Sequence, residues 1–319
     1  MKKLLLLLLV FVVFGLFFSQ NIFAFDYPTR PIYVIVAYSA GGGTDVGARI
    51  LAKVAEKYIP QPLVIINKPG AGGEIGWTEL ANAKPDGYTI GMVNPPTILL
   101  LPYQRKVGYK NSDFKYIINI VEDPGTLCVS TDSPYKNIDD FIKAAEENPG
   151  ILTIANAGVG TDAYMSIIVF EKEAKISVIS VPFKGGGPAR TAVLGGHVDA
   201  NIMKVGEAKR DVESKQIRVL AVMAEERSPE FPNVPTFREK GYDVIMASCR
   251  GIAAPKGVDD YVVKYLHDKL KNTMEDPEFI ALMEKTGIPL KYLGSEEYVN
   301  YCVKLENVYG PLWSEMEEK

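Results

Sequence analysis

The sequence predicts an α/β protein with two lobes that are joined by two crossover strands around a ligand cleft. Strand-like and helix-like segments alternate along most of the 319 residues, which is typical of βαβ units and a largely parallel sheet. Glycine-rich loops lie between several of these strand and helix patterns. No low-complexity linker separates the two series of elements, so we expect strands to connect the lobes.

The first series occupies the N-terminal third of the chain. Apolar runs predict strands at 32–38, 62–67 and 88–93, and amphipathic patterns predict helices at 44–58 and 73–83. A short helical turn is expected after the third strand.

The second series begins with a strand near 125–130. Helices and strands then alternate, starting with a helix, at 137–147, 151–156, 161–174, 176–183 and 188–195. A strand at 216–223 follows. In the C-terminal third we expect one strand and then three helices, near 242–248, 258–275, 276–286 and 295–316.

Two of the strand patterns, 114–122 and 216–223, are candidates for the connections between the lobes. If the chain crosses twice, the C-terminal third returns to the first lobe. We therefore expect one discontinuous lobe from 25–122 plus 222–319 and a second lobe from 123–221, with a hinge between them.

The N-terminus has the order of a secretory signal peptide. Lys2 and Lys3 precede an apolar run, and a polar break and the small residue Ala24 follow it. The run of about 15 residues is short for a membrane-spanning helix, although an uncleaved anchor is the alternative. We expect residues 1–24 to be a signal peptide that is cleaved near Ala24, which places the mature chain in the periplasm.

Composition excludes several classes of function. The formal net charge is −4 and no basic run is present, so we expect no nucleic-acid partner. With only two histidines, His197 and His267, we expect no metal site and no Ser-His-Asp triad. Cys128, Cys249 and Cys302 are far apart in sequence. We interpret them as buried thiols, and one disulfide bond is the alternative.

Four glycine-rich loops invite comparison with nucleotide-binding motifs: SAGGGTD (39–45), KPGAGGEIG (68–76), NAGVGTD (156–162) and FKGGGPAR (183–190). None has the lysine of a P-loop or the glycine spacing of a dinucleotide-binding loop. No G-x-S-x-G nucleophile elbow occurs in the chain. We therefore expect no nucleotide and no cofactor.

The first, third and fourth loops in chain order share another property, because each follows a strand and opens a helix. Thr44, Thr161 and Pro188 are suitable residues for the helix starts. The first turn of a helix exposes unpaired N–H groups, which bind an anion such as a carboxylate. The alternative is that each loop is only a tight turn. An acidic residue in the first turn, such as Asp45, also favours the helix dipole.

These segments resemble the extracytoplasmic substrate-binding proteins of tripartite tricarboxylate transporters, the Bug-type receptors. The resemblance covers nearly the whole mature chain and is carried by YPTRPIYVIVAYSAGGGTDVGAR (27–49), NKPGAGGEIG (67–76), PDGYT (85–89), VPFKGGGPARTAVLGGHVDA (181–200), IRVLAVMAEERSPEFPNVPTFREKGYD (217–243) and GIAAPKG (251–257). It implies the type II periplasmic-binding-protein fold. It also implies a small organic carboxylate ligand and, as partners, the membrane components of a tripartite transporter.

From the loops and the resemblance we expect a ligand site on both lobes. Backbone N–H groups would contact the anion, Lys184 and Arg250 would add positive charge, and Tyr38 would form an aromatic wall. The expected ligand-binding residues are Tyr38, Ser39, Ala40, Gly41, Gly42, Asp45, Asn156, Gly160, Thr161, Lys184, Gly185, Gly186, Met203, Lys204 and Arg250.

Four residues, at three places in the chain, depart from the family pattern. Met203 and Lys204 stand where the family often has an Asp-Asn pair, Tyr164 stands where a histidine is common, and Arg250 replaces an aromatic residue. If these side chains face the cleft, the site loses a carboxylate and gains two cations, which predicts a di- or tricarboxylate. The alternative is that Lys204 and Arg250 point into solvent or pair with nearby acids.

We therefore expect a monomeric solute receptor rather than an enzyme. One alternative is a periplasmic enzyme that acts on a small organic acid, with Cys249 as nucleophile and Arg250 lowering its pKa. Another is a receptor that serves only in sensing.

Overall fold

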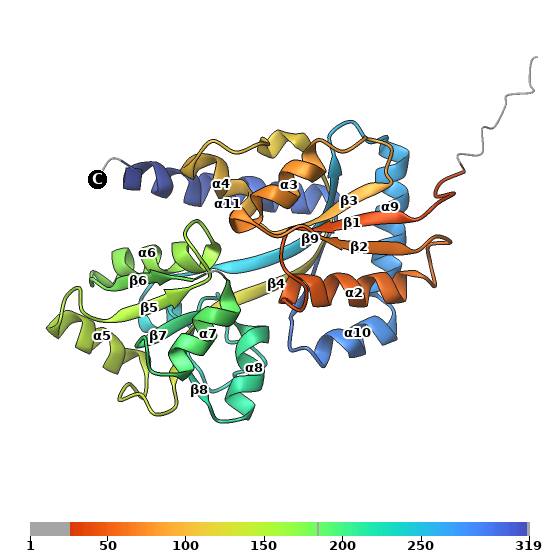
Figure 1. The fold of residues 1–319 in the computed structure, drawn as a ribbon. Helices are drawn as coiled ribbons and strands as arrows, with labels where there is room; N and C mark the ends of the chain where they lie inside the picture. The colour runs from red at the N-terminus through yellow and green to blue at the C-terminus, as the bar shows by residue number, and fades with distance from the viewer. Residues whose placement is uncertain (1–25, 184, 318–319) are drawn as a thin grey trace, which may run out of the picture.

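The computed structural model describes residues 26–183 and 185–317, and Figure 1 shows an α/β molecule of two lobes. The expected signal peptide at 1–24 and the expected site residue Lys184 lie outside the described residues. No helix in the described part of the chain has the length and apolar character needed to span a bilayer.

The first lobe is built on a mixed sheet. Its strands are β1 (Ile32–Val36), β2 (Leu63–Asn67), β3 (Thr89–Val93), β9 (Ala247–Pro255), the first part of β4 (Phe114–Ser130) and β10 (Leu290–Leu293). The first three are parallel, whereas β9 runs antiparallel to both β3 and β4. The helices of this lobe are α2 (Gly43–Ala55), α3 (Glu74–Ala81), α4 (Thr97–Gln104), α9 (Asp260–Met274) and α10 (Pro277–Glu284).

The second lobe has a similar mixed sheet. Its strands are the last part of β4, β5 (Thr153–Asn156), β6 (Ile179–Pro182), β7 (Ala200–Lys204) and β8 (Ile217–Val222). Here β5 is parallel to both β6 and β7, and β4 is antiparallel to β7 and β8. The helices are α5 (Ile138–Glu147), α6 (Asp162–Ala174), α7 (Gly186–Leu194) and α8 (Val205–Glu213).

One long strand, β4, joins the lobes. Its residues 114–124 pair with β9, and from Gly125 onward it pairs with β7 and β8. The segments 114–122 and 125–130, expected as two strands, are therefore one continuous strand. The other predicted crossover was wrong, because the antiparallel partner of β8 is the second-lobe part of β4, and the chain returns through 223–246 to β9.

Backbone hydrogen bonds hold the two connections together. The Gly125 N–H donates to Met246 O at 2.8 Å, the Met246 N–H donates to Met223 O, and the Met223 N–H donates to Gly125 O. These three residues mark the place where the chain passes between the lobes. The lobe boundaries at 122/123 and 221/222 stay a prediction.

Each lobe has its own apolar core. Ile32 and Leu266 are buried in the first lobe, and Phe141 and Phe170 are buried in the second. Burial of such side chains is the main source of stability for a fold of this kind.

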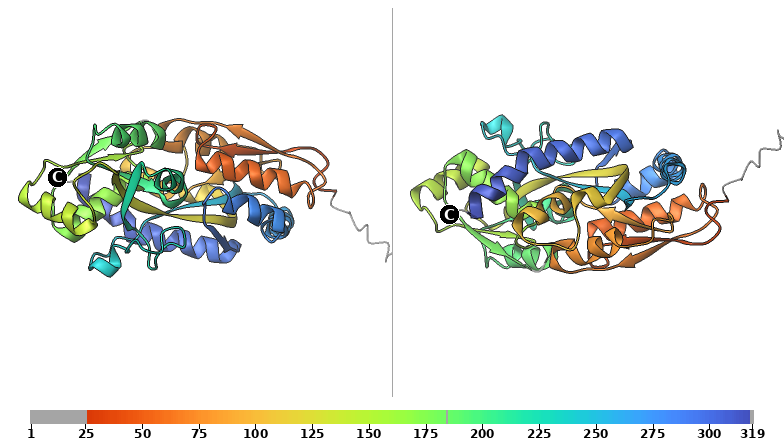
Figure 2. Two further views of the ribbon diagram at one scale, coloured as in Figure 1. Left: turned by 90° about the horizontal axis from the view of Figure 1, so that it is seen from below. Right: turned by 90° about the horizontal axis from the view of Figure 1, so that it is seen from above.

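The C-terminal helix α11 (Ser295–Glu317) contributes to the cores of both lobes. Tyr298 packs in the first lobe, whereas Trp313 packs in the second and stacks on Tyr164 at a ring distance of 5.7 Å. Figure 2 shows α11, in dark blue, passing alongside both lobes. This helix is therefore a third link between the lobes, in addition to the two chain crossings.

Several elements differ from the sequence-based expectations. Three were not predicted, namely β7, α8 and β10. All five residues of β7 are buried and α8 follows it without a loop, so neither shows a separate periodic pattern. The strand expected at 242–248 begins only at Ala247, and antiparallel β9 and β4 in the centre make the sheet mixed rather than largely parallel.

Candidate functional site

The loop after β1 leads directly into α2, whose N-cap residue is Gly42 with no side-chain cap. Thr44 was expected to cap this helix, and that prediction was wrong. Because the helix begins at Gly43, Thr44 lies inside the first turn and its Oγ1 accepts a hydrogen bond from Asn94 Nδ2 at 3.0 Å. Ser39, Ala40 and Gly42 are exposed loop residues. The beginning of α2 faces the second lobe (Figure 1).

Asp45 organises this loop from within the first turn. Its buried carboxylate accepts hydrogen bonds from the Gly41 N–H at 2.8 Å, from Arg49 Nε and from Asn67 Nδ2. Burial acts to raise the pKa of Asp45, but these donors lower it below its ordinary value. Asp45 therefore stabilises the loop rather than facing a ligand. Its carboxylate also accepts the hydrogen bond of the Gly41 N–H, which we had expected to contact an anion.

The turn before α6 is also built by its own side chains. Asn156 Oδ1 accepts from the Gly158 N–H at 2.9 Å, and Asn156 Nδ2 donates to Ser180 Oγ. Thr161 is the N-cap of α6, as predicted, and accepts from the Tyr164 N–H. The polar groups of Asn156 and Thr161 therefore shape the turn.

The third loop brings two helix starts of the second lobe together. Helix α7 begins at Gly186 after the N-cap Gly185, which has a φ of +111°. A Cβ atom on Gly186 would lie 3.6 Å from Glu207 Oε2. The starts of α7 and α8 are therefore neighbours. Glu207 belongs to the first turn of α8, and its carboxylate lies close to the first residue of α7.

Arg250 and Lys204 each pair with an acid, which is the alternative left open by the sequence. Arg250 Nη2 lies 3.0 Å from Asp123 Oδ2, and these two side chains are 4% and 0% exposed. Lys204 Nζ pairs with Asp162, and both of these side chains are almost completely buried. Nearby carboxylates thus balance both cations, so neither adds an uncompensated positive charge.

Two other expected residues lie in apolar surroundings. Met203 packs in a core cluster with Cys128 and Val205. Tyr38 is half-buried and makes an edge-on contact with Trp77 at a ring distance of 5.9 Å. Burial raises the pKa of the Tyr38 hydroxyl above its ordinary value. Tyr38 therefore stays protonated near neutral pH.

A cavity of about 550 Å³ lies between the lobes. The first lobe lines it with the start of α2, Arg250 and the segment 285–288, and the second lobe lines it with one face of α8; Asp123 lines it from the crossover strand β4. Its lining residues are Gly41, Gly43, Val46, Asp123, Gly206, Glu207, Lys209, Arg210, Glu213, Arg250, Lys285, Thr286 and Ile288. Of the expected site residues, Gly41 and Arg250 are among them.

A family model described as tripartite tricarboxylate transporter family receptor matches residues 47–316. The chain belongs to this family. A relative from Cupriavidus necator, described as a UPF0065 protein in the gbd 5′ region, is 35% identical over 87% of this chain and 85% of its own length. The receptor is therefore a periplasmic solute-binding protein by family, with the type II periplasmic-binding-protein fold.

Three solved structures are similar to this receptor. The periplasmic binding protein BugD is 30% identical, with a TM-score of 0.79 over 92% of this chain and 98% of that one. A Rhodopseudomonas palustris protein with bound malate is 26% identical, with a TM-score of 0.78 over 91% and 99% of the two chains. An R. palustris protein with adipate is also 26% identical, with a TM-score of 0.82 over 89% and 97%.

In the receptor, a buried ion pair and a hydrogen bond connect the helix starts of the two lobes. The Arg250 guanidinium lies against the first residue of α2, because a Cβ atom on Gly43 would be only 2.9 Å from Nη2. Asp123 pairs with this guanidinium, and its Oδ1 accepts from the Gly206 N–H of α8 at 3.2 Å. Asp123 thus contacts both lobes at the crossover.

The surroundings of the cavity disfavour ionisation of two acids, Asp123 and Glu207. Burial raises the pKa of Asp123, although Arg250 opposes this effect. Glu207 is open to the cavity, but the surrounding protein and then the Asp123 charge raise its pKa as well. The Asp123 carboxylate therefore makes Glu207 harder to ionise.

Sequence reasoning missed the acids of this site, Asp123 and Glu207. A weak signal was present, because an arginine within the apolar strand pattern around Arg250 needs a buried partner. The sequence does not say which of the 39 acidic residues that partner is. The proposed nucleophile Cys249 is fully buried, and burial raises its pKa, which opposes formation of a reactive thiolate.

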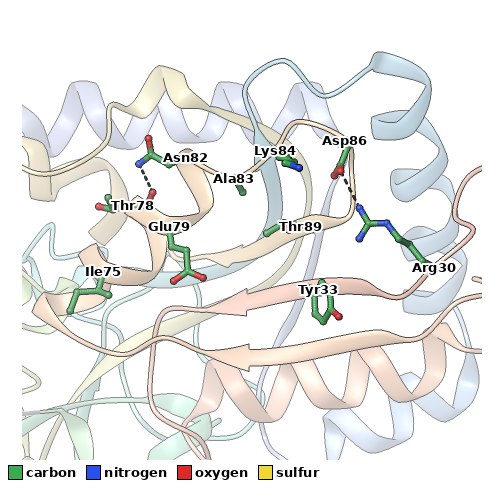
Figure 3. Close-up of a pocket in the computed structure, with 10 residues that line it drawn as sticks. All are labelled: Arg30, Tyr33, Ile75, Thr78, Glu79, Asn82, Ala83, Lys84, Asp86 and Thr89. Carbon is green, nitrogen blue, oxygen red and sulfur yellow. Dashed lines mark hydrogen bonds and ion pairs between the residues drawn. The ribbon is translucent and has the colours of Figure 1, made fainter.

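A second hollow, of about 690 Å³, lies on the first lobe beside α3 (Figure 3). Several of its polar side chains already contact other groups: Arg30 pairs with Asp86 at 3.1 Å, and Asn82 donates to the Thr78 carbonyl. None of the expected ligand-binding residues lines it. The cavity between the lobes is therefore the candidate site.

Proposed function

We propose that this receptor binds a small organic carboxylate in the cavity between its lobes and delivers it to the membrane components of a tripartite transporter. The observation that carries the proposal is the cavity itself, where the start of α2 and the Arg250 guanidinium face the start of α8. The malate and adipate in two similar structures support a carboxylate ligand.

The binding energy would come from preorganised donors. The first turns of α2 and α7 offer backbone N–H groups and a favourable dipole to an anion. Ser39, Gly42 and Gly186 are the proposed backbone contacts, because their N–H groups donate no hydrogen bond among residues 26–183 and 185–317 and they lie at or near these helix starts. The Gly185 N–H, which we had also expected to contact the anion, donates to the Ala157 carbonyl oxygen at 3.1 Å. Ligand contacts with both lobes would then stabilise the closed form.

We propose a dicarboxylate rather than a tricarboxylate. The two cations that suggested high negative charge, Lys204 and Arg250, are paired with Asp162 and Asp123. Binding a third carboxylate would require a further positive group in the inner cavity. Of the other cations on the wall, Lys209 is already paired with Glu230 at 2.7 Å, and Arg210 and Lys285 are at solvent-exposed positions.

Isothermal titration calorimetry of the purified mature protein tests the proposal. We expect succinate or malate to bind, and the matched neutral compound succinamide and the tricarboxylate citrate to bind at least about tenfold more weakly. Native mass spectrometry of the protein as purified would identify a retained ligand. Binding of neutral amides in preference to every carboxylate would overturn the proposal.

Delivery, export and oligomeric state need separate measurements. We propose that residues 1–24 are removed on export and that the mature receptor is a monomer. The mass of the periplasmic protein and its elution volume with light scattering check these two points.

Delivery to a transporter is tested separately. Capture of transporter membrane subunits by the ligand-loaded receptor, and loss of uptake when the receptor is deleted, would support delivery over sensing alone.

A further inference from the structure

The second-lobe wall of the cavity presents a carboxylate to the ligand. Glu207 is in the first turn of α8 and lines the cavity, and its Oε2 makes a long hydrogen bond of 3.4 Å with the Lys204 N–H. Asp123 lies on the same wall with its side chain completely buried. Two acids therefore share one side of a site that we propose to bind an anion.

The first-lobe wall presents hydrogen-bond donors. Arg250 lines the cavity, and its side chain is 4% exposed. Its Nη2 pairs with Asp123, but Nε and Nη1 have no hydrogen-bond partner among residues 26–183 and 185–317. Buried guanidinium donors without partners are costly. A ligand that enters between the lobes can supply the missing acceptor.

We propose that the ligand carries an amino group as well as a carboxylate, with its carboxylate toward Arg250 and the start of α2 and its ammonium toward Glu207. This inference rests on the proposed function and narrows the ligand to an aminocarboxylate. A simple dicarboxylate would satisfy the donors of Arg250 but would place negative charge near Glu207.

An ammonium suits this wall better than a hydroxyl does. Asp123 and Glu207 both line the cavity, so their negative charges repel each other, and a cation relieves this repulsion while a neutral hydroxyl does not. Two nearby lysines have other partners, since Lys204 pairs with Asp162 and Lys209 pairs with Glu230, and the cavity-lining Arg210 and Lys285 are at solvent-exposed positions. Charge-assisted hydrogen bonds from an ammonium to a carboxylate are also stronger than neutral ones.

A matched ligand series tests the inference in the mature full-length protein. Succinate, malate and L-aspartate differ at one carbon by hydrogen, hydroxyl and ammonium, and glutarate and L-glutamate extend the comparison by one carbon. Titration calorimetry at one pH and ionic strength should show the amino compound binding at least about tenfold more tightly than the unsubstituted diacid of the same length.

The variant Glu207→Gln separates the role of the charge from the role of the fold. Glutamine keeps the shape and can still accept from the Lys204 N–H, so the start of α8 is preserved. We expect this variant to lose the preference for the amino compound, with a ratio near 1, because loss of the negative charge weakens binding of the ammonium and strengthens binding of the diacid. Glu146→Gln, at an exposed position in α5, removes the same charge elsewhere and should leave the ratio unchanged.

The outcomes distinguish the inference from the proposed function. If the diacids bind as tightly as their amino counterparts, or if Glu207→Gln keeps the preference, the inference is overturned while carboxylate binding stands. If no compound of either series binds and only neutral solutes do, the proposed function fails and the inference fails with it.

Discussion

Gln104 and Gly160 join the two lobes on the side of α4. Gln104 Nε2 donates to the Gly160 carbonyl oxygen at 3.2 Å. Gly160 has a φ of +86°, and a Cβ atom there would overlap the side-chain amide of Gln104. Both the backbone conformation and the contact between the lobes therefore require glycine at this position.

Substitution of Gly160 by alanine should weaken the protein. We expect Gly160→Ala to lower the free energy of unfolding by about 1–3 kcal/mol, because it adds backbone strain and displaces Gln104. Urea denaturation measures this change. Gly187→Ala is the matched control, since Gly187 lies in the first turn of α7 with no atom within 4 Å of its Cβ position. Equal stability of the two variants would contradict the prediction.

Two glycines of α2 should respond in opposite ways to alanine. In Gly43→Ala the new Cβ would meet the Arg250 guanidinium, whereas at Gly47 the nearest atom is the Met283 methyl at 4.0 Å. We expect Gly47→Ala to stabilise the helix by about 0.5–1 kcal/mol. We expect Gly43→Ala to shift Arg250 and to weaken carboxylate binding by about tenfold or more. Calorimetric titration and urea denaturation of both variants check this; unchanged binding in Gly43→Ala would show that the Arg250 position does not matter.

The three cysteines should be unreactive in the folded protein. All are free and buried, burial raises the pKa of Cys128 to about 12, and the thiols of Cys249 and Cys302 are also shifted upward. We expect a thiol reagent at pH 8 to label none of them within minutes, and to label all three in guanidinium chloride. Rapid labelling of one native thiol that disappears in Cys249→Ala would instead favour the enzyme alternative.

The Asp276 carboxylate should make stability depend on acidity between about pH 4 and pH 2. Hydrogen bonds from Tyr58 and Lys57, and then from the Glu278 N–H, lower its pKa from 3.8 to about 2. A carboxylate whose pKa is lower in the folded than in the unfolded state stabilises the fold at every pH above its unfolded-state pKa. This contribution is lost as the pH falls through the folded-state pKa.

The comparison of wild type with Asp276→Asn isolates this contribution. We expect the variant to be less stable at neutral pH, and the difference in melting temperature to stay constant down to about pH 4 and then to shrink toward pH 2. The variant Glu146→Gln serves as the exposed reference. A difference that is independent of pH across this range would mean that the charge of Asp276 contributes nothing.

Local patterns predicted much of the fold. The strand at 32–38 and the helix at 44–58 correspond to β1 and α2, and Thr161 caps α6 as expected. These features depend on nearby residues, through side-chain periodicity and the hydrogen bonds of a single turn. The buried strand β7 was missed, because a strand covered on both faces lacks the alternation that marks a half-buried one.

The site was predicted less completely. The rule that helix starts follow parallel strands was enough to propose the glycine loops as ligand contacts, which stays a prediction. The partners of the charges could not be predicted in this way, because they depend on the sheet register. Asp123 meets Arg250 only because β4 and β9 pair side by side across the crossover, and Glu207 reaches the cavity only because α8 begins where β7 ends.

The sequence by itself determined the alternating elements, the glycine-opened helices and the family of this receptor. Only the tertiary structure decided how the charges around VAYSAGGGTDVGAR are balanced. Asp45 closes the loop onto the Gly41 N–H, and Asp123 takes one side of Arg250 at the start of the helix. The reason is physical: a buried charge is set by the partners that lie within a few ångströms of it, and those partners come from distant parts of the chain.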